Sequence, residues 1–179
     1  MFITIFYEPI LGGKLLQKYD MKSDEVAYFF SIFSISVFST NLFLTFFPLK
    51  KRFMLWIVVS SVFSVLSILL MGPSRLLQIP DNLIVMAVGT GMLGVARQVY
   101  SVSMVVHTLQ PLYKMFPGQT NRISKLFAAF RQIAIAFAFF SSPFYASGVT
   151  SVSSYETTCD SVAIILLVYL TVFLGVHLS

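Results

Sequence analysis

Four long stretches without a charged side chain constrain this chain more than any other feature. They cover residues 26–47, 53–74, 132–155 and 161–179, and each is roughly 19 to 24 residues long. An α-helix needs about 20 apolar residues to cross the hydrocarbon core of a bilayer. A helix also bonds all its backbone N–H and C=O groups internally, which a bilayer demands. The four stretches therefore predict membrane-spanning helices.

The composition excludes a soluble helical protein. Only 11% of the residues are charged, 57% are hydrophobic, and the mean hydropathy is +0.86. A soluble domain has about 25% charged residues. A very apolar soluble core would need polar helices around it, and the sequence contains none. We therefore predict an all-α membrane protein.

Two further apolar segments complete a bundle of about six transmembrane helices in a single domain, residues 1–179. Pro48 and the Gly72-Pro73 pair mark helix ends, because proline cannot continue the helical hydrogen bonds and disfavours helix in the residue before it. The predicted helices are residues 1–16, 26–47, 53–71, 82–110, 126–148 and 161–178. The first is short for a crossing. Either it is re-entrant, or its beginning is missing from this chain.

The loops differ in charge between the two sides of the predicted bundle. One side holds only basic residues: Lys50, Lys51, Arg52, Lys114, Arg122 and Lys125. The other mixes four basic with six acidic residues: Lys14, Lys18, Lys22, Arg75, Asp20, Asp24, Glu25, Asp81, Glu156 and Asp160. The positive-inside rule places the basic side, and both termini, in the cytoplasm.

This arrangement explains the net charge of +5 without a nucleic acid partner, since the basic residues lie in short clusters between apolar segments. The single cysteine, Cys159, excludes an internal disulfide and a cysteine-rich metal site. No cofactor or metal is predicted, and the bilayer is the expected surrounding.

Three short motifs resemble the second half of a major facilitator superfamily transporter. They are Glu8-Pro9 followed by Leu11-Gly12-Gly13, then Met71-Gly72-Pro73-Ser74 at the end of the third helix, and the glycine-rich segment from Gly89 to Gly94. The Gly-Pro-Ser element is similar to that of the vesicular amine and polyamine branch. The superfamily has an acidic residue in the basic turn that corresponds to residues 47–52, and this chain has none there.

The resemblance implies one six-helix half of a twelve-helix major facilitator fold. Such proteins bind substrate between two halves, each built of inverted three-helix repeats. The other, N-terminal half would come from a longer protein, of which this chain is the C-terminal part, or from another chain. The implied function is secondary active transport of a small organic solute by alternating access, with proton coupling as one option.

Glu8 and Arg97 are the main candidates for the substrate or proton pathway. A charge at membrane depth is costly and marks a functional site by default. The resemblance implies that the first and fourth helices line the central cavity, and these helices carry Glu8 and Arg97. Glu8 lies about 15 Å and Arg97 about 22 Å below the outer side of the bundle. The difference between these depths is within the reach of an arginine side chain. We expect an ion pair or two separate contacts, with Glu8 as proton carrier or partner of a cationic substrate.

Arg131 is a third pathway candidate, in the fifth predicted helix. Its alternative role is purely interfacial, because a long arginine side chain near a helix end can extend to the membrane surface. The small residues Ala87, Gly91 and Gly94 predict a close contact between two helix backbones. They do not predict a dinucleotide site, because no strand precedes the glycines.

Other functions remain open at this point. A non-transporting polytopic protein, such as a receptor-like or scaffold protein, would have the same pattern, as would a half-size protein that acts only as an oligomer. A channel is a further alternative. An intramembrane enzyme is disfavoured, because Glu8 is the only carboxylate within the predicted spans.

Overall fold

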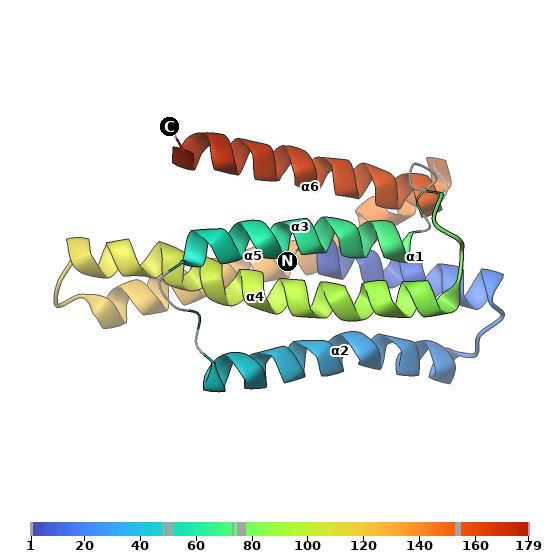
Figure 1. Cartoon of the computed structure of the whole chain (residues 1–179), viewed down its shortest axis with the longest axis horizontal. Helices are drawn as coiled ribbons and strands as arrows, with labels where there is room; N and C mark the ends of the chain where they lie inside the picture. Colours follow the sequence, from blue (N-terminus) through green and yellow to red (C-terminus); the bar gives the residue numbers. More distant parts are fainter. Residues whose placement is uncertain are drawn as a thin grey trace.

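The computed structural model describes residues 2–47, 49, 52–72, 74, 78–152 and 155–178, without the side chains of residues 2–9, 138–139, 142–152 and 177–178. Helices are the only regular elements in this described part. They are α1 (Phe2–Lys18), α2 (Ser23–Phe46), α3 (Phe53–Met71), α4 (Leu83–Met115), α5 (Thr120–Val152) and α6 (Tyr155–Leu178). Successive helices run in opposite directions, as the colours in Figure 1 show.

Four of the helices are long and apolar enough to cross a membrane: α2, α3, α4 and residues 155–176 of α6. The outer surface of the bundle is apolar as well. Tyr28, Phe38, Phe137 and Phe140 are each about 70% exposed or more. Soluble monomers rarely expose large contiguous apolar patches. The chain is thus an all-α protein with the helices and surface of an integral membrane protein.

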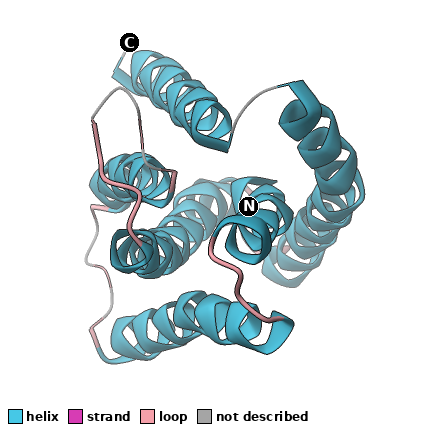
Figure 2. Cartoon of the chain, turned by 90° about the vertical axis from the view of Figure 1, so that its right-hand side faces the viewer, coloured by secondary structure: helices cyan, strands magenta, loops and turns pink. Residues whose placement is uncertain are grey.

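The helices pack in a few extensive pairs. α4 lies between α3 and α2, α3 also contacts α6, and α1 packs along α5. Figure 2 shows this arrangement along the helix axes. One end of the bundle, here called the acidic end, carries Asp20, Asp24, Glu25, Asp81, Glu156 and Asp160. The opposite end, here called the basic end, carries Arg52, Lys114, Arg122 and Lys125.

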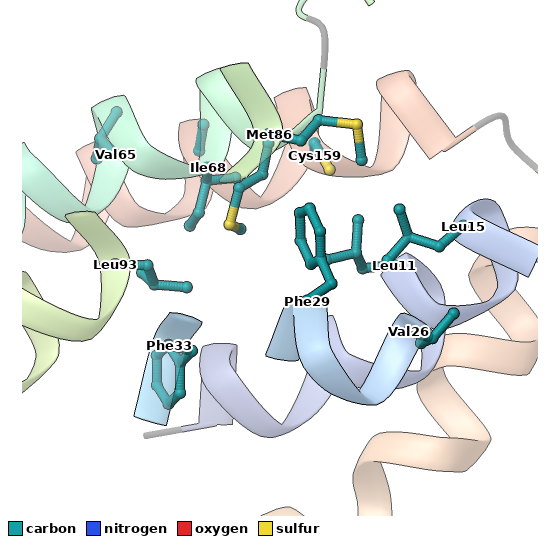
Figure 3. Packing of buried hydrophobic residues seen from close by; sticks show 12 residues of the cluster. Leu11, Leu15, Val26, Phe29, Phe33, Val65, Ile68, Met86, Leu93 and Cys159 are labelled. Atoms are coloured by element: carbon teal, nitrogen blue, oxygen red, sulfur yellow. The ribbon is translucent and has the colours of Figure 1, made fainter. Parts of the chain in front are cut away.

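Among the described side chains, the hydrophobic core joins α1, α2, α3, α4 and α6. Leu11 and Leu15 of α1 are fully buried, as is Met71 of α3, and Met86 of α4 is nearly so. Figure 3 shows Phe29 of α2 and Cys159 of α6 in the same cluster. The core thus fixes the acidic end, where the helices converge.

Two helices extend further than the sequence predicted. The predictions ended the fourth helix near residue 110 and began the fifth at 126, whereas α4 continues to Met115 and α5 begins at Thr120. A turn at residues 116–119, with Gly118 at φ +92°, suffices to connect them. The Tyr113 and Ser124 hydroxyls lie 2.6 Å apart and join the two extensions. The polar composition of this segment did not predict the helical hairpin, because polar residues occur in helices as well as in loops.

The sixth helix begins earlier than predicted. α6 starts at Tyr155 and not at residue 161, so most of the expected polar loop is helical. Glu156 lies in its first turn, where a negative charge interacts favourably with the helix dipole. This shift brings Tyr155 and Glu156 into the acidic end of the bundle.

Candidate functional site

Arg97 lies deep in α4 and on its inner side. It is 14 residues beyond Leu83, about 21 Å along the helix axis. The exposed apolar residues of α4 include Val88 and Val95. With about 3.6 residues per turn, Arg97 projects nearly opposite to both of them. The half-buried Arg97 side chain therefore points away from the exposed stripe and towards the interior of the bundle.

A hollow of about 350 Å³ lies beside the Arg97 side chain. Apolar and polar groups share its lining, which consists of Phe33, Ser34, Val37, Phe38, Asn41 and Arg97. The guanidinium carbon of Arg97 lies 5.4 Å from the centre of the Phe33 ring. A cation over a ring face at this distance is attracted by the ring's quadrupole. Arg97 is thereby held at the edge of the hollow.

Amide and hydroxyl groups extend this polar region. Gln98 Nε2 donates to Asn41 Oδ1 at 3.0 Å, which connects α4 to α2. Arg131 Nη2 of α5 donates to Ser101 Oγ of α4 at 3.3 Å. Ser101 lies one helical turn beyond Arg97, on the same side of α4. Two arginines from different helices therefore reach adjacent turns of α4.

The predicted partner of Arg97 falls outside what can be described. Glu8 belongs to α1, but its side chain lies outside the described residues. The pairing of Glu8 with Arg97 stays a prediction. The structure does show that Arg131 reaches the region of Arg97, because it donates to Ser101, one helical turn from Arg97.

The small residues of α4 lie on two different helix contacts. A Cβ atom on Gly94 would lie 2.8 Å from the Phe33 carbonyl oxygen of α2, and one on Gly91 would lie 3.3 Å from Ser36 Oγ. Ala87 packs against the hydrophobic core. Gly89, which the sequence analysis did not place in a contact, faces α3 instead, where a Cβ would lie 2.9 Å from the Ser67 carbonyl oxygen.

A second polar cluster, at the acidic end, centres on Lys14 of α1. Its side chain is only 6% exposed, and its Nζ lies 3.1 Å from Asp81 and 3.9 Å from Glu156. The same Nζ lies 4.3 Å from the centre of the Tyr155 ring. Tyr155 in turn donates to the Met71 carbonyl oxygen at 3.1 Å. One buried ammonium thus ties α1 to the segment before α4 and to α6.

Asp81 accepts hydrogen bonds from Lys18 and Tyr19 and forms an ion pair with Lys14. Burial by itself would raise the pKa of Asp81, but the two hydrogen bonds and the positive charge of Lys14 outweigh it and lower the pKa to about 2. Burial and the bond to Asp81 raise the pKa of Tyr19 to about 12. Asp81 is therefore ionised and Tyr19 neutral throughout the physiological range.

Acid is expected to weaken the acidic end through Asp81. Because the pKa of Asp81 is lower in the folded chain than its ordinary value of 3.8, the contribution is complete above about pH 4 and is lost as the pH falls to about 2. The loss is about 1 kcal/mol, given the partial solvation of the carboxylate. Unfolding midpoints of the wild type and Asp81→Asn between pH 5 and pH 2 measure it.

The wild type should lose this stability on acidification, and Asp81→Asn should lack that component. Asp20→Asn, at an exposed carboxylate of the same end, should keep the wild-type profile. An unchanged pH profile in Asp81→Asn would contradict the role of this carboxylate.

Two groups of residues that the fold brings together were not predicted from the sequence. Phe33 and Asn41 lie far from any charge along the chain, and Gln98, although next to Arg97, had no signal of its own. Lys14, Asp81 and Glu156 carried a weak signal, because alternating helices place all three at one end. That sidedness did not reveal their contact, which depends on the early start of α6.

No protein-family model, no curated protein and no solved structure matches this chain.

Proposed function

We propose that the chain is one six-helix unit of a secondary active transporter, which moves a small organic solute by alternating access. One observation carries the proposal, namely the relation between helices α1–α3 and helices α4–α6. Exchanging α1 with α4, α2 with α5 and α3 with α6 converts the α1–α5 pair into the α4–α2 pair. It leaves the α3–α6 pair unchanged, but it converts the most extensive pair, α3–α4, into the far less extensive α1–α6 pair, so the exchange is partial. Such exchange is typical of repeats in transporters.

The directions of the helices support an inverted repeat. α1 ends at the acidic end and α4 begins there, so the first helices of the two triplets run antiparallel (Figure 1). Inverted repeats place their substrate site near the bilayer midplane. Arg97, on the first helix of the second triplet, lies at such a depth and next to a hollow.

In this proposal all six helices cross the membrane, with the basic end and both termini in the cytoplasm. α5 has 33 residues, and the 17 residues of α1 pack along it. Both helices would cross with the other four, since they belong to the same bundle. A second six-helix unit, in a longer polypeptide or another chain, would complete the substrate site. Membership in the major facilitator superfamily is part of the proposal.

Solute flux in proteoliposomes tests the transport function. The chain, reconstituted at known orientation together with the six-helix unit that completes the substrate site, is assayed for exchange of labelled organic ions and for uptake driven by an inward proton gradient. Saturable exchange is the expected result. Glu8→Gln should lose gradient-driven uptake at least tenfold and retain exchange, since exchange moves no net proton.

Two results would refute parts of this proposal. Flux that does not saturate with solute concentration indicates a channel, and no flux from the assembly of both six-helix units indicates a non-transporting protein. Equal pH dependence in the wild type and Glu8→Gln removes proton coupling by Glu8, whatever the flux. Arg122→Gln, at the start of α5, is the control for reconstitution.

A further inference from the structure

We propose that the exposed polar side of α2 is an interface at which two copies of this chain meet across a two-fold axis along the membrane normal. The inference rests on the proposed function, because it names the second six-helix unit that would complete the substrate site. Four observations support it: the position of α2 at the edge of the bundle, the pattern of its exposed residues, an open amide pair and the hollow beside that pair.

α2 lies along one edge of the bundle (Figure 1). It packs extensively on α4 and only slightly on α1. One side of the helix is buried, with Val26, Phe29, Phe33 and Thr40. The remaining sides of α2 therefore face outwards, either towards lipid or towards another protein.

The exposed part of α2 divides into an apolar side and a polar side, since each residue turns the helix by about 100°. The large apolar residues that face outwards form one group: Tyr28, Ile35, Leu42 and Phe46. A second group, here called the polar seam, recurs at alternating intervals of four and three residues: Ala27, Ser31, Ser34, Phe38, Asn41 and Thr45. All of its members but the half-buried Ser31 are exposed. The apolar side suits lipid, whereas the polar seam has the spacing at which one helix packs along another.

The polar seam carries an amide that lipid cannot satisfy. Asn41 lies about 22 Å from Val26, within the uncharged stretch of residues 26–47. A polar group without a hydrogen bond is costly in hydrocarbon, and membrane helices satisfy such groups across helix–helix contacts. The exposed position of Asn41 therefore favours a protein neighbour on this side of α2.

The amide pair of Gln98 and Asn41 offers both a donor and an acceptor. Gln98 Nε2 donates to Asn41 Oδ1 at 3.0 Å, and within the described part of the chain neither Asn41 Nδ2 nor Gln98 Oε1 has a partner. An interface about a two-fold axis must be self-complementary. In such a pair, Asn41 of each copy can donate to Gln98 of the other, so that both open groups are used twice.

The membrane restricts how two copies can meet. They insert with the same orientation, because the charges of their loops are the same. The two-fold axis must then be parallel to the membrane normal, so that α2 meets α2 in parallel and at equal depth. Each residue of the polar seam would lie close to the same residue of the other copy. A second copy thus presents an amide at the depth of Asn41, which neither lipid nor an arbitrary helix would.

The hollow beside Arg97 belongs to the same surface. Ser34, Phe38 and Asn41 line it and are also exposed residues of the polar seam. A helix that packs on the seam would therefore cover the open side of the hollow and convert it into a cavity between two six-helix units. Transporters built of repeats bind substrate at such an interface.

Disulfide cross-linking of the full chain in membranes tests the interface. The single native cysteine is first replaced, as Cys159→Ala, so that an introduced cysteine is the only one. Ser34→Cys should give dimers on mild oxidation, because the axis brings the two copies of position 34 within disulfide reach. Ile35→Cys, which lies on the apolar side, should give about fivefold less. A scan of residues 34–42 should show maxima at 34, 38 and 41 and minima at 35, 39 and 42.

Dimerisation in liposomes measures the role of the amide. Energy transfer between labelled copies, recorded at increasing protein-to-lipid ratio, gives the dissociation constant of the dimer. Asn41→Leu should weaken the dimer about tenfold, since two symmetric hydrogen bonds between helices are lost. Ser39→Leu, at an exposed serine on the apolar side of α2, should dimerise like the wild type. Circular dichroism checks that both variants are folded.

Three results would overturn the inference: no dimer at any protein density, equal cross-linking from both sides of α2, or dimerisation of Asn41→Leu like that of the wild type. Lipid or a different six-helix unit on the polar seam predicts the first result. The proposed function fails separately. A dimer without saturable flux refutes transport and leaves the interface intact. Saturable flux of the chain paired with a different unit, without dimers, refutes the interface and leaves transport intact.

Discussion

Lys14→Met is expected to lower the free energy of unfolding by about 3 kcal/mol, because it removes a buried ammonium that lies between two partly buried carboxylates. The ammonium is 6% exposed and lies between Asp81 and Glu156, whose side chains are 21% and 20% exposed. Methionine retains most of the volume of the lysine side chain. The expected loss of stability therefore comes from the missing charge and not from a cavity. Denaturant unfolding in detergent micelles, followed by circular dichroism, measures it.

Lys18 provides a matched control on the same carboxylate. Its Nζ also pairs with Asp81, but its side chain is 53% exposed. Solvent-exposed ion pairs contribute about 0 to 1 kcal/mol, so Lys18→Met should have a small effect. Equal losses in the two variants would show that burial does not decide the strength of the pair. Adding Asp81→Asn to Lys14→Met should recover part of the loss, since Asp81 has then lost one of its two ammonium partners.

Gly89→Leu is expected to destabilise the bundle by about 3 kcal/mol, through overpacking between α3 and α4. A Cβ at this position would lie 2.8 Å from Met71 Cγ and 2.9 Å from the Ser67 carbonyl oxygen. The backbone oxygen cannot move away without disturbing α3. Because α3 and α4 form the most extensive helix pair, the whole bundle should respond. The unfolding midpoint of the variant measures the effect.

Gly175→Leu is the control for Gly89→Leu. A Cβ on Gly175 of α6 would meet no atom within 4 Å, so this substitution should be neutral or slightly stabilising. If Gly89→Leu were as stable as Gly175→Leu, the close contact between α3 and α4 would be wrong. Gly94→Leu is a second overpacking variant, which should disturb the α2–α4 contact.

These two regions divide the bundle into parts with different roles. The Lys14 cluster and the α3–α4 contact hold the acidic end together, where the core also lies. The Arg97 hollow lies further along α4 and is lined by side chains of α2. Substitutions at the first two sites should therefore change stability.

Much of the fold follows from the sequence because the bilayer imposes one rule on the whole chain. A segment that crosses hydrocarbon must be apolar and helical. The ranges 53–71 and 161–178 therefore agree with α3 and most of α6. Helix ends next to polar segments were predicted less well, as α4 and α5 show. Outside the apolar spans the same residues form helix or loop, and in the structure the Tyr113–Ser124 contact joins the two helices there.

The sequence by itself determined the class of the protein, the approximate helices, the sidedness of charge and the position of Arg97 in an apolar helix. Each of these depends on local composition or on the alternation of helices. Only the tertiary structure decided which residues meet: Phe33 and Asn41 at Arg97, Asp81 and Glu156 at Lys14, and Gly89 against α3. Such contacts depend on helix rotation and register, because a small change of either replaces every neighbour of a side chain while the apolar pattern stays the same.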